Sequence, residues 1–253
     1  MATVDGVDGK VALVVGGTAG IGLSTAEAFV RAGAMVVVAG RSAAAGEAAV
    51  GLLTRSGGSA RYLPADVQDP DSVSRMVSTV VAEYGRLDIA FNNAGWDGPA
   101  TPTADIDEAD WLGMVNTKLS GVWRCMKYEL RQMTRQDGGG AVVNMAGNWG
   151  LVGFPGYSSY CAAAHGIMGL TKAAAKEYAR QGIRINSVCP GAVRSPMLDR
   201  MVGGDEGLVE VFGDGVAAGR VATPEEVANA VLWLSSAAAS YVNGAGLVLD
   251  GGG

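Results

Sequence analysis

Short apolar runs alternate along the chain with longer Ala-rich stretches of helical length. A strand buried on both faces carries a continuous apolar run, whereas a helix repeats its apolar positions about every 3.6 residues. Alternation of the two is typical of βαβ units in a parallel sheet. The short runs predict strands at Val11–Val15, Met35–Ala39, Arg61–Leu63, Leu87–Phe91, Ala141–Met145, Arg184–Val188 and Gly246–Leu249. The longer stretches predict helices at Gly22–Ala32, Ala43–Ser56, Asp71–Tyr84, Tyr157–Gln181 and Pro224–Ser235, and a long helix that begins near Asp107.

About seven strands with interleaved helices predict an α/β fold, a single doubly wound Rossmann domain over residues 1–253. The sequence contains no internal repeat or linker that would divide it. Only the Gly-rich stretch Met201–Arg220 departs from the alternation. Because it follows the end of a strand, residues 201–220 are predicted to form a substrate lid, with a flexible surface loop as the alternative.

Composition and charge narrow the class of protein. Apolar residues make up 49% of the 253 positions and charged residues 17%, which is enough for a large core. The net charge of −6 and the lack of Lys/Arg clusters argue against nucleic acid or an anionic membrane as partner and leave a small-molecule substrate. Three widely spaced cysteines show no disulfide or zinc spacing, so no metal site is predicted. Segment Met1–Lys10 lacks the basic start of a signal peptide, and we expect a cytoplasmic protein.

The first predicted strand leads directly into the Gly-rich stretch Gly16–Gly22 and then into a helix. Glycines at such a turn let the backbone approach a pyrophosphate at the positive end of the helix. With 39 glycines in the chain, a glycine spacing alone would be weak, and its position after the first strand carries the interpretation. The stretch therefore predicts a dinucleotide site.

The second predicted strand is followed by Gly40 and Arg41. At this place an acidic residue binds the ribose 2′-hydroxyl of NAD(H), whereas a basic residue can bind the 2′-phosphate of NADP(H). Arg41 therefore favours NADP(H), with NAD(H) possible. A solvated loop charge is the other interpretation of this arginine.

Several short motifs follow in a fixed order: Gly16-x-x-x-Gly20-x-Gly22, Asp66-Val67, Asn92–Gly95, Cys189–Gly191 and Arg194–Met197. Together they resemble the classical short-chain dehydrogenase/reductase family over essentially the whole chain, with Val15 where that family usually has Thr. The resemblance implies a seven-stranded Rossmann fold, usually assembled as a homodimer or homotetramer. It assigns cofactor binding to Gly16, Thr18, Gly20, Ile21, Gly22, Arg41, Asp66, Val67, Asn93, Ala94, Gly95, Pro190, Gly191, Val193 and Ser195.

The resemblance also locates four catalytic positions, of which two are changed. The family uses a Ser that holds the substrate oxygen, a Tyr that passes the proton, a Lys four residues after the Tyr and an Asn that completes a proton relay. Tyr160 and Asn116 match the Tyr and the Asn. The Lys position is Ala164, and the Ser position, thirteen residues before the Tyr, is Gly147. Neither replacement carries a polar side-chain atom.

These losses affect the two reaction directions unequally. A lysine one helical turn after the Tyr shares its face and lowers the pKa of the phenol. Without that cation a phenol has a pKa near ~10, so about one molecule in a thousand is ionised at pH 7. Alcohol oxidation needs the phenolate as base and suffers most, whereas carbonyl reduction uses the neutral phenol. Both directions lose the Ser hydrogen bond, commonly worth on the order of 10²–10³ in rate.

Cations of the following helix are not expected to replace the missing lysine. His165, the single histidine, lies five residues after Tyr160 and faces another direction, so a structural role is favoured. Lys172 and Lys176 lie three turns or more along the same helix, too far to reach Tyr160.

The substrate is expected to contact Asn148, Trp149 and Trp96. Asn148 and Trp149 follow the Ser position at the carboxyl end of a strand, where sheet enzymes bind ligands, and Asn148 could donate to a substrate oxygen. Loop capping by Asn148 and packing of Trp149 are the alternative. A pocket lined by Gly147–Val152, Trp96–Pro99 and the 201–220 stretch suits a mostly hydrophobic carbonyl or alcohol.

The favoured function is an NAD(P)(H)-binding oxidoreductase with a reduced set of catalytic groups, in which Tyr160 is the proton donor. One alternative is a non-redox isomerase, lyase or cyclase on the same scaffold. Others are an inactive subunit and a variant in which positions 147 and 164 were changed deliberately. Ala146 and Asn148 also depart from the family's Ser-rich segment, which favours natural divergence.

Overall fold

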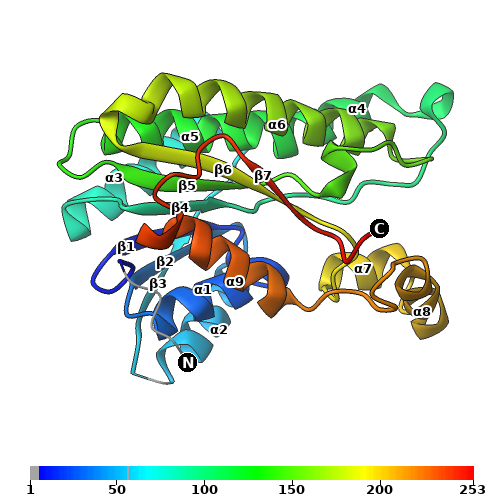
Figure 1. Ribbon diagram of the computed structural model, residues 1–253, viewed down its shortest axis with the longest axis horizontal. Coiled ribbons are helices and arrows are strands. Elements are labelled where there is room, and N and C mark those ends of the chain that lie inside the picture. The colour runs from blue at the N-terminus through cyan, green and yellow to red at the C-terminus, as the bar shows by residue number, and fades with distance from the viewer. Residues whose placement is uncertain (1–5, 56) are drawn as a thin grey trace.

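Seven parallel strands pair in the order β3-β2-β1-β4-β5-β6-β7 in the computed structural model, which describes residues 6–55 and 57–253 (Figure 1). The first strand pairs with both β2 and β4, so the strand order reverses direction there. Ligands of doubly wound sheets bind beyond the carboxyl ends of the strands at such a reversal. The strands are β1 (Val11–Val15), β2 (Met35–Gly40), β3 (Ser59–Pro64), β4 (Ile89–Asn92), β5 (Gly140–Met145), β6 (Ile183–Pro190) and β7 (Gly246–Leu249).

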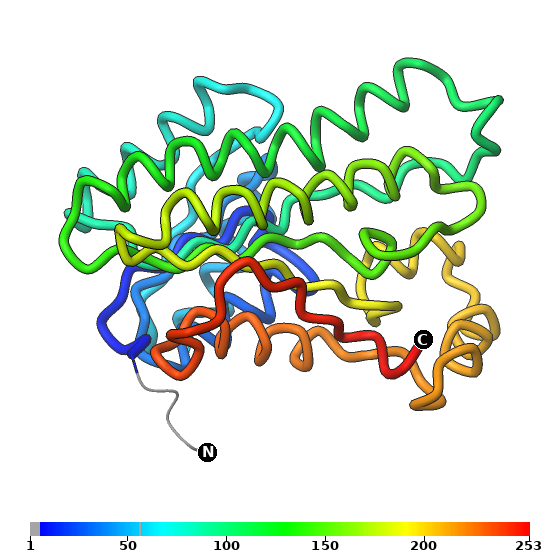
Figure 2. Tube along the Cα trace, turned by 45° about the horizontal axis from the view of Figure 1, so that its top comes forward, coloured from blue at the N-terminus to red at the C-terminus, as the bar shows by residue number. Residues whose placement is uncertain are grey.

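Two layers of helices cover the sheet (Figure 1). One layer holds α1 (Gly20–Arg31), α2 (Ala43–Thr54) and α9 (Pro224–Ser235). The opposite layer holds α3 (Pro70–Tyr84), α4 (Glu108–Met114), α5 (Ser120–Met133) and α6 (Ser158–Tyr178). Two further helices, α7 (Pro196–Met201) and α8 (Glu206–Asp214), lie at one end of the domain beside the C-terminus (Figure 2). Short 3-10 turns are η1 (Thr103–Asp105), η3 (Asn148–Gly150), η4 (Ala179–Gln181) and η5 (Ala237–Ala239).

The apolar runs build two cores, one on each face of the sheet. On β1, Leu13 points into the core shared with α3, α5 and α6, while Ala12 and Val14 point into the core shared with α1, α2 and α9. All five side chains of β1 are buried. A strand covered on both faces needs apolar residues at every position, which explains its continuous run.

The structure confirms the predicted α/β fold with seven parallel strands and helices on both faces. Strands Val11–Val15 and Gly246–Leu249 and helix Pro224–Ser235 have the predicted bounds, and the bounds of the other elements agree or differ by one to three residues. The helix predicted over Ala43–Ser56 ends at Thr54, and Ser56 lies outside the described residues.

One predicted helix is interrupted. The long helix expected from near Asp107 consists of α4, a π-helical segment η2 (Val115–Leu119) and α5. A π-helical turn inserts an extra residue and rotates the side chains that follow it. Periodicity at 3.6 residues could not show this change, which sets where the side chains of residues 115–119 point.

The Gly-rich stretch Met201–Arg220 is more regular than predicted, because α8 occupies its middle. Asp205 caps this helix by accepting a hydrogen bond from the Gly207 amide, and an Arg194–Glu206 ion pair holds its first turn. The C-terminal residues pack beside it, with the Ala218 amide donating to the Gly251 carbonyl. Within the described residues, no helix combines the length and apolar character needed to cross a membrane.

Candidate functional site

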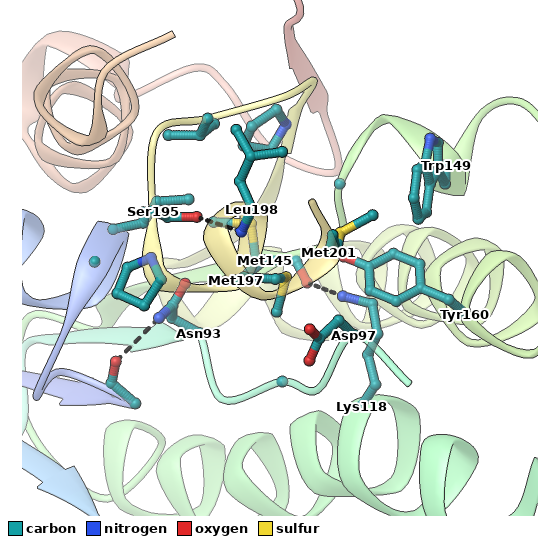
Figure 3. A pocket seen from close by; sticks show the side chains of 18 of the residues that line it. Asn93, Asp97, Lys118, Met145, Trp149, Tyr160, Ser195, Met197, Leu198 and Met201 are labelled. Carbon is teal, nitrogen blue, oxygen red and sulfur yellow. Dashed lines mark hydrogen bonds between the residues drawn. The ribbon is translucent and has the colours of Figure 1, made fainter. Parts of the chain in front are cut away.

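A cavity of about 880 Å³ opens at the carboxyl ends of the central strands (Figure 3). Its wall runs from the β1–α1 turn, past the ends of β2 and β4, to η3 and α6 on one side and α7 and α8 on the other. The size suits a dinucleotide together with part of a substrate. The fold therefore places the two predicted sites, one for the cofactor and one for the chemistry, in a single space.

The β1–α1 turn depends on its glycines. Gly16 has a φ of +77° and Gly20 a φ of +52°, and a Cβ on Gly16 would lie 2.8 Å from the Ala94 amide nitrogen. A Cβ on Gly22 would lie 2.0 Å from the Gly16 carbonyl oxygen, so no larger residue fits between the turn and α1. Asn93 Nδ2 donates to that same carbonyl at 3.0 Å (Figure 3). Bare backbone and the start of α1 thus face the cavity, a cradle that fits a pyrophosphate.

Residues predicted for the adenosine end lie at the tips of β2 and β3. Arg41 is exposed, lines the cavity and takes part in none of the ion pairs among residues 6–55 and 57–253. Asp66 Oδ1 accepts from the Gln68 amide at 2.9 Å, while the Asp66 amide donates to Ser72 Oγ at 3.0 Å. These bonds shape the loop next to Val67, which also lines the cavity.

On the side of the cavity away from the predicted adenosine end, the loop after β6 and the start of α7 cover the β1–α1 turn. Ser195 Oγ caps α7 by accepting from the Leu198 amide at 3.4 Å (Figure 3). A Cβ on Gly20 would lie 3.3 Å from Pro196 Cδ, so α7 approaches the glycine turn closely. All predicted cofactor positions line the cavity except Gly22, whose place is the close contact with Gly16.

Tyr160 is half-buried in the first turn of α6 and lines the cavity. Gly147, at the predicted Ser position, has a φ of +88° and a ψ of 158°, a conformation open essentially only to glycine. A Cβ built there would lie 3.2 Å from Tyr160 Oη, so position 147 does face the phenol. Ala164, at the predicted Lys position, is fully buried and packs against Gly150 of η3, whose own Cβ would lie 3.0 Å from the Ala164 carbonyl oxygen.

Asn116 faces away from the phenol. Its Oδ1 accepts from Arg124 Nη2 at 2.6 Å, its carbonyl oxygen accepts from Arg124 Nη1 at 3.1 Å, and its Nδ2 donates to Gln68 Oε1 at 3.3 Å. The residues that line the cavity from this segment are Thr117 and Lys118. The structure therefore places Asn116 beside the cavity wall, with both its side chain and its carbonyl held by Arg124.

Lys118 is the residue that sequence reasoning missed. Its side chain is buried, with 2% of the residue exposed, and its Nζ lies 4.2 Å from the centre of the Tyr160 ring (Figure 3). Nζ also donates to the Met145 carbonyl oxygen at 3.4 Å, at the end of β5. A signal was present: Lys118 lies four residues from Met114 and four from Val122, both buried apolar residues, so a lysine occupies the inward face of this segment.

Aromatic side chains form one wall beside Tyr160. Trp149 stacks on Phe154 with ring centres 4.4 Å apart and meets the Tyr160 ring edge-on at 5.3 Å. Trp149, Phe154 and the neighbouring Asn148 line the cavity, and contact of Asn148 and Trp149 with a substrate stays a prediction. Trp96 does not line it and packs toward Gly113 of α4.

Asp97 provides a second charge that the sequence did not reveal. It is 8% exposed, lines the cavity and accepts from Arg200 of α7 at 3.2 Å. The pair ties the loop after β4 to the helix on the other side of the cavity. Burial, together with the negative charge of Asp97, raises the pKa of Tyr157.

His165 is exposed on α6 with Nδ1 2.9 Å from the Cys161 carbonyl oxygen, in keeping with a structural role.

Comparisons with known proteins agree with this arrangement. A family model described as Enoyl-(Acyl carrier protein) reductase matches residues 16–253. The chain is 39% identical over 246 residues to 2,5-dichloro-2,5-cyclohexadiene-1,4-diol dehydrogenase of Sphingobium indicum, covering 97% of each chain. It is also 39% identical over 242 residues to cyclohexanol dehydrogenase of an Acinetobacter species, covering 96% of this chain and 94% of the relative.

Solved structures show the same fold. Levodione reductase superposes with a TM-score of 0.93 at 35% identity over 96% of each chain. A variant of actinorhodin polyketide ketoreductase with NADPH superposes with a TM-score of 0.92 at 35% identity over 98% of each chain. Both likenesses extend over nearly the whole chain, including the segments that form the cavity.

Proposed function

Because the chain belongs to the short-chain dehydrogenase/reductase family, we propose that this oxidoreductase interconverts a ring-bearing secondary alcohol and its ketone with NADP(H), NAD(H) being the alternative cofactor. One observation carries the proposal: a single cavity contains both the glycine turn and the Tyr160 side chain. A dinucleotide held by the turn would therefore extend toward the phenol, as the redox reaction requires.

The residues of the turn fit the cofactor. Gly16 and Gly20 expose backbone at the N-terminus of α1, and a side chain at Gly16 would clash with the backbone of Asn93 and Ala94. Arg41 supplies a cation at the tip of β2, which supports a preference for the 2′-phosphate of NADP(H). When bound, the nicotinamide would exchange a hydride with the substrate carbon. The structure neighbour solved with NADPH is in keeping with this assignment.

Tyr160 would move the proton that accompanies this exchange. In reduction, the phenol O–H gives its proton to the substrate oxygen as C=O becomes C–OH, and in oxidation the phenolate takes it back. Asn148 lies on the same wall and can donate a hydrogen bond to the substrate oxygen, a contact the family obtains from its serine. Gly147 places no side chain against the phenol, since a Cβ there would lie 3.2 Å from Tyr160 Oη.

The walls near Tyr160 favour a cyclic, mostly apolar substrate. Trp149, Phe154 and Val152 line one side, and Met197, Met201 and Phe212 line the side formed by α7 and α8. Flat aromatic faces and flexible thioethers suit a ring of variable substitution. Two relatives bear names of ring alcohol dehydrogenases, which supports the same substrate class.

A homodimer or homotetramer is part of the proposal. Trp111 of α4 and Trp123 of α5 are 38% and 48% exposed on the outer surface of one helix layer. Exposed aromatic side chains on neighbouring helices are typical of interaction surfaces. Light scattering after size exclusion should give a mass of two or four times 25.6 kDa.

Steady-state assays on a panel of cyclic alcohols and ketones, with NADP(H) and NAD(H), test the reaction. We expect turnover that Tyr160→Phe lowers by about a hundredfold or more, since general acid–base groups contribute roughly 10²–10⁴ in rate. Fluorescence titration should give saturable binding of NADPH by both proteins, with weaker binding of NADH. Binding without turnover on the whole panel would contradict the redox proposal and favour a non-redox or inactive protein.

A further inference from the structure

Lys118 is a buried cation in the cavity wall. The residue is 2% exposed; its Nζ donates to the Met145 carbonyl oxygen at 3.4 Å and lies over the face of the Tyr160 ring, 4.2 Å from its centre. The ion pairs formed within residues 6–55 and 57–253 do not include it. An ammonium group has three donors, so the remaining capacity faces the cavity beside the phenol.

Burial of such a group is costly. Lysine is almost never fully buried without a partner, and removing its charge from water costs several kcal/mol unless another group offsets the loss. A carbonyl and an aromatic ring together offset about 1–3 kcal/mol. Packing alone would be served better by Met or Leu, residues that flank this position at Met114 and Leu119. The lysine therefore points to a role in the chemistry of the cavity.

We propose that Lys118 replaces the lysine missing at position 164 and acts through Tyr160 as its positioning residue. The inference rests on the proposed function. The family's lysine reaches the phenol from the same helix, whereas Lys118 reaches it from η2, across the interface between that segment and α6. In oxidation, the substrate O–H proton passes to the Tyr160 oxygen and the hydride to the oxidised dinucleotide, leaving C=O. The ammonium of Lys118 favours the phenolate that accepts this proton.

The π-helical segment gives Lys118 its direction. Lys118 lies four positions after Met114, and within η2 its side chain is directed at the ring of Tyr160 (Figure 3). The close approach of α6 to η2 occurs at Gly166, where a Cβ would lie 2.8 Å from Leu119 Cδ2. The small residue at position 164 fits this arrangement. With a cation supplied from η2, Ala164 can pack against η3.

Other ionisable groups near Lys118 belong to three elements. Tyr160 faces it from α6, and Asp97 lies in the same part of the cavity on the loop after β4, already paired with Arg200 (Figure 3). Cys189 of β6 is buried, which raises its pKa to about 11 against the opposing influence of Lys118 and Lys172. With the thiol neutral at physiological pH and Asp97 paired with Arg200, Tyr160 is the ionisable group against which the Lys118 ammonium lies in the cavity wall.

Lys118→Met and Lys118→Gln test the proposal, with Lys127→Met as the matched control. Lys127 also lies near aromatic rings, 5.5 Å from Trp123 and 5.2 Å from Tyr128, but outside the cavity. We expect both Lys118 variants to lower kcat for alcohol oxidation at pH 7 by about tenfold or more, to affect ketone reduction less, and to shift the rise of oxidation with pH toward alkaline values. Lys127→Met should match the wild type in kcat for oxidation, in ketone reduction and in the pH dependence of oxidation. Gln keeps a donor for the Met145 carbonyl, so equal losses in both variants exclude a purely structural hydrogen bond.

A spectroscopic measurement separates this inference from the proposed function. The ultraviolet absorbance of tyrosinate is measured as a function of pH for each protein, with and without the additional substitution Tyr160→Phe. The difference between the two curves isolates Tyr160 among the seven tyrosines. With Lys118 present, that difference should appear at lower pH than in Lys118→Met. If it does while the panel shows no turnover, the proposed reaction fails and only the effect of Lys118 on the ionisation of Tyr160 stands. Turnover with an unchanged tyrosinate difference and an unchanged oxidation profile in both Lys118 variants would overturn the inference.

Discussion

The two ends of the cavity differ in what forms the site: the backbone at one end and side chains at the other. At the proposed dinucleotide end, the backbone forms the site: Gly16 and Gly20 have positive φ angles, and close contacts leave no space for a Cβ on Gly16 or Gly22. At the proposed catalytic end, side chains form the site, and two of the four positions predicted from the family resemblance, Gly147 and Ala164, have none that is polar. The predicted pattern is complete at the first end and incomplete at the second.

The difference has a physical cause. A backbone cradle is set by φ angles and interatomic distances that cannot be supplied from elsewhere in the fold. A side-chain charge can be supplied by any element whose residues reach the same point, and Lys118 reaches the phenol from η2. Loss of a catalytic residue from a motif is therefore weaker evidence of lost function than loss of a glycine from the turn.

Gly16→Ala should give the largest effect, because it attacks the end that cannot be rebuilt. The new Cβ would meet three backbone atoms of Asn93 and Ala94 within 3.1 Å, at a φ of +77° that L side chains rarely adopt. We expect dinucleotide affinity to fall by about a hundredfold, from about 3 kcal/mol of strain and displacement, with a lower Tm. Fluorescence titration with NADPH and thermal unfolding measure both.

Gly51→Ala is the matched control for that substitution. Gly51 lies within α2, and a Cβ there would meet nothing within 4 Å. Alanine should raise stability by about 0.5–1 kcal/mol through helix propensity and leave NADPH binding unchanged. Tight NADPH binding by Gly16→Ala would show that the turn tolerates side chains and would remove the contrast between the two ends.

The next largest effect is expected at a buried carboxyl group of α5. Glu129 of α5 is fully buried, its Oε2 accepts from Asn92 Nδ2 at 3.0 Å, and its Oε1 has no protein partner among the described residues. Burial raises the pKa of Glu129 from 4.5 to about 7. The unfolded chain thus releases this proton at lower pH than the folded protein, so the raised pKa lowers stability progressively between about pH 4.5 and pH 7.

Glu129→Gln removes that ionisation while keeping the shape of the side chain. At pH 8 we expect it to raise the free energy of unfolding by about 3 kcal/mol, and at pH 4 by little, because both states are then protonated. Glu177→Gln on the exposed side of α6 is the control and should change neither value. Denaturant unfolding at the two pH values gives the comparison. An equal effect of Glu129→Gln at both would show that the carboxyl does not titrate between them.

The sequence signals for the proposed dinucleotide end are local. Gly16–Gly22 follows a strand whose apolar run is unmistakable, and Arg41 follows the next strand directly. The catalytic end depends on contacts between distant segments. Lys118 and Tyr160 belong to different segments and meet where η2 packs against α6, and Trp96 leaves the cavity because it packs toward Gly113. Asp97 and Arg200, 103 residues apart, could be paired only in the folded chain.

Gly147→Ser should give the smallest effect. It places the family's residue at the proposed catalytic end and so tests the difference between the two ends of the cavity directly. The backbone at 147, with φ +88° and ψ 158°, costs a serine about 2 kcal/mol, and its Cβ would stand 3.2 Å from Tyr160 Oη. We expect a lower Tm and no gain in kcat. Gly169→Ser, on an open face of α6 where a Cβ meets nothing within 4 Å, should leave both unchanged or slightly raise Tm. A tenfold gain in kcat for Gly147→Ser without loss of stability would mean that the catalytic end still accepts the family's serine and that only the side chain, and not the backbone, has diverged there.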